Sequence, residues 1–345
     1  MEKKRDEAIS FLHTFGIILV VLGHSFIAYN DTYGEDAPNY LYSWRLFAMP
    51  LFMFMSGYLL KYTTRAKNRP LGGMTTGDIG KFIAKKAKRL LIPYIVISSA
   101  VFPIKAIMSA YAIHPVDMTL GSYIYMLAYP LENAIRFFWF LPTLFVIFVI
   151  VAIGAYCLKR LHLKIHPAII LLILLIPHFT PIEFPPIRLL NIGGAINLHL
   201  LYFASGYYAC QYNLSGYIEK HRNTILALTF VISIILAFIP TSSLNTFVKA
   251  YNGIIMSFAL AHVYVHHQCK FLNPYFEASF AIYLFSWFPQ VTTQQILLSF
   301  VPIPWLLDTI LAFATGFFIP YFIYRLIIRY KHTQVGRVVA LLTGQ

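Results

Sequence analysis

Two histidines lie inside the first long apolar stretch of the chain, which runs from Ala8 to Tyr29. His13 and His24 are eleven residues apart, which in an α-helix is three turns plus about 20°, so both lie on one face. Histidine ionises near neutral pH and can accept or donate a proton there. Ionisable groups within a membrane span usually face a bundle interior or a wet cavity, which makes the pair a candidate for proton transfer. The spacing supports equally well two histidines that are hydrogen-bonded to neighbouring helices.

The stretch that carries these histidines is long enough to cross a bilayer. Its roughly 22 residues span about 33 Å as a helix, against a hydrocarbon core of about 30 Å. Of the 345 residues, 59% are hydrophobic and only 12% are charged, about half the charged fraction of a soluble domain. We predict an all-α integral membrane protein with one domain, 1–345, and about ten transmembrane helices. The predicted spans are roughly 8–29, 43–61, 90–112, 137–157, 167–180, 192–212, 223–240, 246–267, 275–297 and 305–328, with prolines such as Pro93 at many ends.

Lysine and arginine cluster at the two ends of the chain and in alternate loops. If the N-terminus is inside, 22 of the 27 Lys and Arg residues fall on the cytoplasmic side, as the positive-inside rule requires. The sequence therefore predicts a plasma (inner) membrane protein with both termini in the cytoplasm and loops 30–42 and 181–191 outside. Topology and anionic lipid account for the net charge of +14, so we predict no nucleic-acid partner.

Six motifs occur in a fixed order along the chain. They are LVVLGHSF, RLFAMPLFMFMSGYLL, KRLLIPY, FFWFLPTLF, LYFASGYYA and SFAIYLFSW. In this order and spacing, from about residue 5 to residue 330, the chain resembles membrane acyltransferase family 3, and in particular members similar to fucose 4-O-acetylases and other surface-polysaccharide O-acyltransferases. It departs from the family pattern at three positions: His13 replaces the usual Arg or Lys, Ser10 the frequent acid, and Ser286 the usual His.

The resemblance implies transfer of an acetyl or similar acyl group from cytoplasmic acyl-CoA to a hydroxyl of a cell-surface or lipid-linked sugar. In such a reaction a general base removes the hydroxyl proton, and a neutral histidine is the usual base. His24 matches the histidine of the family's first span, so we expect it to be the base, with His13 as its partner.

Charged residues near the two membrane surfaces are candidates for binding the donor and the acceptor. On the inner side a basic segment follows a glycine-rich loop, and we expect it either to bind CoA phosphates or to lie on lipid headgroups; its members are Lys81, Lys85, Lys88 and Arg89. On the outer side, where an acceptor would arrive, we expect either substrate contacts or solvated charges at Arg45, Glu132 and Arg136.

Other functions and other sites remain as alternatives. The chain could be an exporter of a polysaccharide or small metabolite, or a scaffold that has kept the fold and lost activity. The sequence contains no metal-ligand or P-loop spacing, so we predict no metal and no permanently bound cofactor. We expect Gly57 to mark close helix packing, Trp139 to be an interfacial anchor, and His199 and His262 to be buried and hydrogen-bonded.

Overall fold

The computed structural model describes residues 6–33, 47–66, 70–107, 117–183, 185–240, 242–294 and 304–344. In these ranges the chain is helical, with short connections and no β-strand. The all-α prediction is therefore confirmed for this part of the chain.

The described residues divide into two compact units. Unit 1 draws on 1–52 and 213–340, and unit 2 on 53–212 and 341–344. The helices of unit 1 are α1 (Glu7–Tyr33), α10 (Leu214–Lys220), α11 (Arg222–Ala237), α12 (Ser243–His266), α13 (Ser279–Phe285), α14 (Trp287–Thr292) and α16 (Trp305–Tyr330). Those of unit 2 are α4 (Thr76–Ile107), α5 (Leu120–Ala128), α6 (Phe140–Arg160), α7 (Pro167–Phe179), α8 (Ile192–Gly194) and α9 (Leu200–Gln211). The division between units falls inside α3 (Ala48–Ala66) and α17 (Gln334–Leu342).

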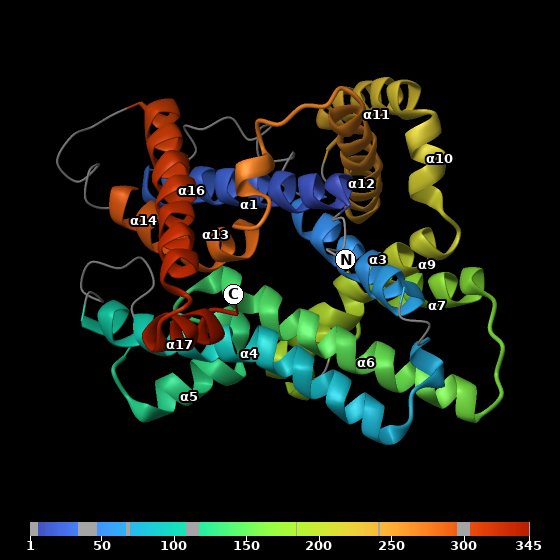
Figure 1. Ribbon diagram of the computed structural model, residues 1–345, viewed down its shortest axis with the longest axis horizontal. Coiled ribbons are helices and arrows are strands. Elements are labelled where there is room, and N and C mark those ends of the chain that lie inside the picture. Colours follow the sequence, from blue (N-terminus) through green and yellow to red (C-terminus); the bar gives the residue numbers. More distant parts are fainter. Residues whose placement is uncertain are drawn as a thin grey trace. The chain divides into compact units, whose positions relative to one another are not determined.

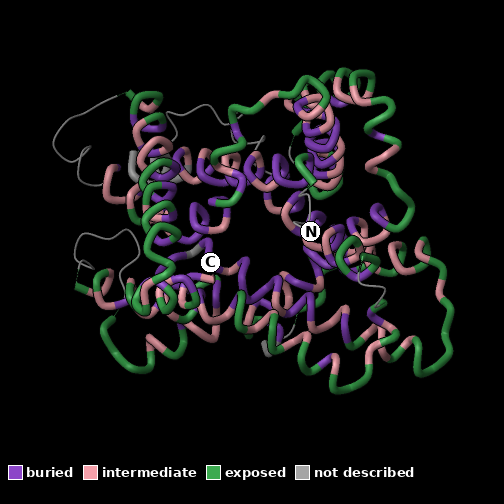
Figure 2. Tube along the Cα trace, in the orientation of Figure 1, coloured by how far each residue is buried: buried purple, intermediate pink, exposed green. Residues whose placement is uncertain are grey.

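Helix α1 forms the centre of unit 1. Its N-terminus is capped by Asp6, whose Oδ1 accepts hydrogen bonds from the backbone N–H groups of Ala8 and Ile9 at 3.1 and 3.3 Å, as an N-cap residue does. It packs against α12, α13 and α16, so the first helix and the last long helix lie side by side (Figure 1). Leu12 and Val21 of this helix are fully buried, and Figure 2 shows buried segments along the trace of α1.

Five helical segments are long and apolar enough to cross a membrane, within the residues described. They are Glu7–Phe26, Thr76–Ile107, Phe137–Arg160, Ile187–Gln211 and Trp305–Tyr330, and each overlaps a predicted span. The bent pair α10 and α11, with 95° between the two helices, would make a sixth if it forms one span. Ten spans and cytoplasmic termini therefore stay predictions.

Helix α4 differs from its predicted limits of 90–112. We placed a helix boundary at Pro93, and this was wrong, because α4 continues through Pro93. The helix starts at a capping box, in which Thr75 Oγ1 accepts from the Asp78 N–H and Asp78 Oδ2 accepts from the Thr75 N–H, both at 3.2 Å. Proline inside a membrane helix is tolerated where neighbouring groups compensate for the lost hydrogen bond, and Pro93 is buried. The basic segment and the third span are thus one helix.

The predicted ninth span, 275–297, is interrupted. Helix α13 ends at Phe285 and α14 begins at Trp287, with a break at Ser286. Pro289 explains the break, because it has no N–H to donate to the carbonyl of Phe285 and its ring crowds that carbonyl. The residue at which the chain departs from the family's usual histidine therefore lies at a helix break.

Glycines bring two helices of unit 2 into backbone contact. A Cβ added at Gly57 of α3 would collide with the carbonyl oxygen of Phe203, and a Cβ at Gly206 of α9 would collide with the carbonyl oxygen of Phe54. The prediction that Gly57 marks close packing is confirmed, and the contact is reciprocal because each helix contributes one glycine.

Candidate functional site

His13 and His24 both lie on α1, an unbroken helix of 27 residues. Both side chains are half-buried. The continuous helix places them on one face, and its rise separates them by about 16 Å. That distance is too long for a hydrogen bond between the two rings, and the His13 ring instead lies 6.3 Å from the ring of Phe52. His13 can therefore act on His24 only at a distance or through other groups.

Buried polar groups contact the single turn of α1 from Val21 to Ser25, which we name the His24 turn. Gln290 Nε2 donates hydrogen bonds to the carbonyl oxygen of Val21 at 2.8 Å and to Ser25 Oγ at 2.9 Å. Gln294 Nε2 donates to the carbonyl oxygen of Ser25 at 3.0 Å. Ser25 Oγ in turn donates to the Val21 carbonyl at 2.9 Å. Side chains remote in sequence thus bracket the turn that carries His24.

A buried carboxylate completes this polar cluster. Asp308 in the first turn of α16 is only 1% exposed, and its Oδ2 accepts a 2.6 Å hydrogen bond from the amide of Gln294. Asp308, Gln290 and Gln294 were not among the predicted site residues. A single acid in the otherwise apolar run WLLDTILAF was a usable signal for the first of these, because ionisable groups inside a span are candidates for function.

The four predicted donor-binding residues all lie on α4 with exposed side chains: Lys81, Lys85, Lys88 and Arg89. They form an exposed basic surface, which is compatible with phosphate binding and with lipid contact. Lys86, between them in sequence, is oriented differently. Its ammonium group lies 3.5 Å from the ring centre of Phe148 and 5.4 Å from that of Phe82, a cation–π arrangement. The basic run therefore contains one lysine that packs inside unit 2.

Of the three predicted acceptor-side residues, only Glu132 has a side chain that the structure describes. Arg45 lies outside the described residues. Arg136 begins the 3₁₀ turn Arg136–Trp139, and its side chain is also outside the description. Glu132 Oε1 lies 3.7 Å from Arg188 Nη2, and both side chains are exposed. An exposed pair of this kind contributes little to stability, so these charges remain available to a ligand.

A second group of aromatic and histidine side chains lies in unit 2. Trp139 stacks on His199 with 4.9 Å between ring centres. His199 is buried as predicted, but its Nδ1 has no hydrogen-bond partner among the described residues. His199 ends the π-helical turn Ala195–His199, a distortion often found at functional sites. His262 is hydrogen-bonded as predicted, with its Nε2 2.9 Å from Ser215 Oγ, but it is half-buried and not buried.

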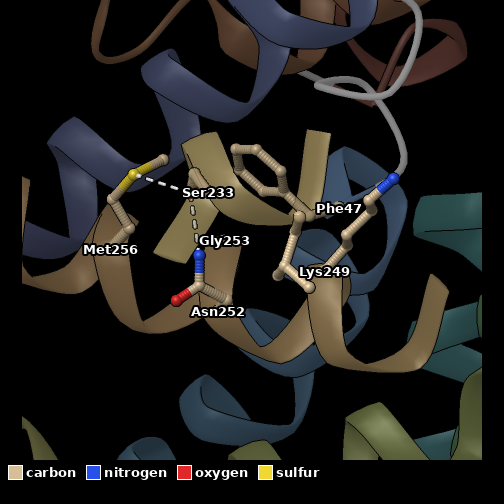
Figure 3. A pocket seen from close by; sticks show the side chains of 7 residues that line it. Phe47, Ser233, Lys249, Asn252, Gly253 and Met256 are labelled. Carbon is tan, nitrogen blue, oxygen red and sulfur yellow. Dashed lines mark hydrogen bonds between the residues drawn. The ribbon is translucent and has the colours of Figure 1, made fainter. Parts of the chain in front are cut away.

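A small cavity in unit 1 lies between α11, α12 and Phe47 (Figure 3). Its volume of about 30 Å³ suits about two water molecules. Asn252 Nδ2 lies at its wall and donates to the carbonyl oxygen of Thr229 at 2.9 Å and to Ser233 Oγ at 2.8 Å. The cavity is too small for an acyl chain or a sugar ring, so we assign the amide of Asn252 a structural role in joining α11 to α12.

Metal ligands do not gather anywhere in the described ranges, where no group of three His, Cys, Asp or Glu side chains could hold an ion. Cys157, Cys210 and Cys269 are free thiols.

These features define an α-helical membrane protein with an intramembrane histidine whose helical turn is held by buried polar side chains. The chain belongs to the acyltransferase 3 family, because the family model described as an acyltransferase domain matches residues 6–325. The match covers nearly the whole chain, so the protein is a membrane acyltransferase. No curated protein and no solved structure matches it significantly.

Proposed function

We propose that the protein transfers an acyl group, most simply acetyl, from cytoplasmic acyl-CoA to a hydroxyl of a cell-surface or lipid-linked sugar. The observation that carries the proposal is His24, a half-buried histidine within the first membrane span of a member of this family. The distribution of Lys and Arg supports a location in the plasma membrane with both termini in the cytoplasm.

His24 is the general base in this proposal. Its neutral ring accepts the hydroxyl proton while the sugar oxygen attacks the carbonyl carbon of the thioester. The carbon–sulfur bond then breaks, and the proton passes from His24 to the departing sulfur, which gives the sugar ester and free CoA. Each proton thus has a defined donor and acceptor, and a base of this kind contributes about 10²–10⁴-fold to the rate.

The depth of His24 sets how the donor must approach. The residue lies sixteen positions beyond Ala8, or about 24 Å along the helix axis. The long arm of CoA would carry the acyl group to this depth and leave its phosphates at the inner surface. There the exposed basic surface of Lys81, Lys85, Lys88 and Arg89 would bind them by charge-assisted contacts. Arg45, Glu132 and Arg136 are the proposed contacts for the acceptor.

The test compares His24→Gln with His262→Gln in purified protein in lipid nanodiscs. Glutamine can form hydrogen bonds but cannot take up a proton at neutral pH, and in the control variant it can keep the bond to Ser215. The assay follows radiolabelled acetyl transfer from acetyl-CoA to glycolipid extracted from cells that lack the gene. We expect kcat to fall by about 10²–10⁴-fold in His24→Gln and to stay within about twofold of the wild type in His262→Gln.

Near-wild-type transfer by His24→Gln would remove His24 from the role of base. Mass spectrometry of surface glycans from cells with and without the gene tests the acceptor class separately. A set of acylated sugars that is identical in the two strains would contradict the proposed acceptor.

A further inference from the structure

The side chains that bracket the His24 turn come from the other end of the chain. Gln290 and Gln294 are four residues apart, so they occupy one face of the segment that follows the break at Ser286. The structure makes room for the first of them: a Cβ at Gly316 of α16 would collide with the side chain of Gln290. Three separate features, the break, the spacing and the glycine, direct these amides at α1.

Two hydrogen bonds orient the side-chain amide of Gln294. Both of its hydrogens are used, one for the carbonyl oxygen of Ser25 and one for the carboxylate of Asp308. Its Oε1 is buried and has no partner in the described part of the chain. A buried acceptor without a hydrogen bond lowers the stability of the folded state. The two hydrogen bonds that Gln294 donates, to Asp308 and to the Ser25 carbonyl, must offset that cost. Asp308 is suited to anchor the link, because an acid in the first turn of a helix interacts favourably with the helix dipole.

We propose that Asp308, Gln294 and Gln290 are positioning residues that fix the rotation and depth of His24. Asp308 holds Gln294, and the two glutamines hold the carbonyl groups at either end of the His24 turn. The inference rests on the proposed role of His24 as base. Catalytic geometry is sensitive to such support, since a displacement of about 1 Å can cost about 10²-fold in rate.

Unit 1 contains a matched comparison for this network. Like Gln290, Asn252 is a buried amide that donates to a helix carbonyl and to a serine hydroxyl. Asn252, however, joins α11 to α12. If buried amides act only as general packing elements, Asn252→Leu and Gln294→Leu should have similar effects. If Gln294 positions His24, only Gln294→Leu should alter the chemistry beyond what a loss of stability explains.

The kinetic experiment measures kcat and the KM for acetyl-CoA in nanodiscs at a temperature at which all variants remain folded. We expect Gln294→Leu and Asp308→Leu to lower kcat by about 10²-fold without changing KM, because neither residue binds the donor. Asp308→Asn should retain most of the activity, since its amide oxygen can still accept the bond from Gln294. Asn252→Leu should leave kcat within about twofold. Equal losses in Gln294→Leu and Asn252→Leu would overturn the proposal.

A second measurement does not depend on activity. His24→Cys is introduced after Cys157, Cys210 and Cys269 have been replaced by alanine, and its rate of labelling by a membrane-permeant maleimide is recorded. We expect Gln294→Leu to change this rate several-fold and Asn252→Leu to leave it unchanged. The same rate in folded Gln294→Leu as in its parent would overturn the positioning role. Absence of acyl transfer by the wild type would instead count against the proposed function, while the labelling result would still decide the positioning role.

Discussion

Replacing Gly206 by alanine tests the close contact between α3 and α9 in unit 2. The added methyl group would collide with the carbonyl group of Phe54 and lie 2.9 Å from its Cα. The obstacle is backbone, which cannot rotate away, so the variant carries an overpacking cost of about 1–3 kcal/mol. Gly154 in α6 is the matched control, because a Cβ there meets no atom within 4 Å. Both variants gain the same helix propensity, about 1 kcal/mol relative to glycine, so their difference isolates the packing cost.

Thermal unfolding in one detergent at one scan rate gives the comparison, since membrane proteins commonly unfold irreversibly. Each kcal/mol shifts the Tm of a domain of 150–250 residues by about 2–4 °C. Gly206→Ala should therefore melt about 2–12 °C below Gly154→Ala, and Gly154→Ala should melt at or slightly above the wild type. A Gly206→Ala protein as stable as Gly154→Ala would refute the backbone contact between the two helices.

Two further predictions concern orientation and donor binding. In a cysteine-free background, an impermeant thiol reagent added to intact cells should label Glu183→Cys and not Lys164→Cys. The two exposed residues flank α7, so they lie on opposite sides of the membrane if this helix crosses it. Equal labelling would show that this 13-residue helix does not cross the membrane. Replacing Lys81, Lys85, Lys88 and Arg89 together by Gln should raise the KM for acetyl-CoA several-fold, and added salt should raise it in the wild type. Lys220→Gln is the control, and an unchanged KM in the fourfold variant would leave lipid contact as the role of this surface.

Long apolar runs made much of the helical framework predictable. The predicted spans 8–29 and 305–328 agree closely with α1 and α16, because an uninterrupted apolar run of this length has few other stable states in a membrane. Gly57 was correctly associated with close packing for a related reason, since small residues let helix backbones approach. His24 was predicted as a site residue because ionisable side chains are rare inside a membrane span; its role as the base is a proposal.

Sequence patterns did not predict helix limits and side-chain orientations correctly where these depend on neighbours in the folded protein. Pro93 was placed at a helix end and lies inside α4, whereas Pro289 breaks the segment that was predicted to continue. The sequence alone does not tell these cases apart, because the surroundings decide whether the lost hydrogen bond is compensated. Lys86 shows the same limit: it is adjacent in sequence to the predicted donor-binding lysines, and only packing shows that its ammonium group lies against the ring of Phe148.

The polar cluster around His24 was beyond local patterns for a further reason: its partners are 265 to 269 residues apart in sequence. The bond between Thr14 Oγ1 and Ser279 Oγ, 3.2 Å long, joins the same two ends of the chain. Helix α1 is synthesised first, yet the groups that hold the His24 turn follow more than 250 residues later. The geometry of the proposed base is thus a property of the completed unit 1, and no N-terminal fragment that lacks α14 and α16 contains it.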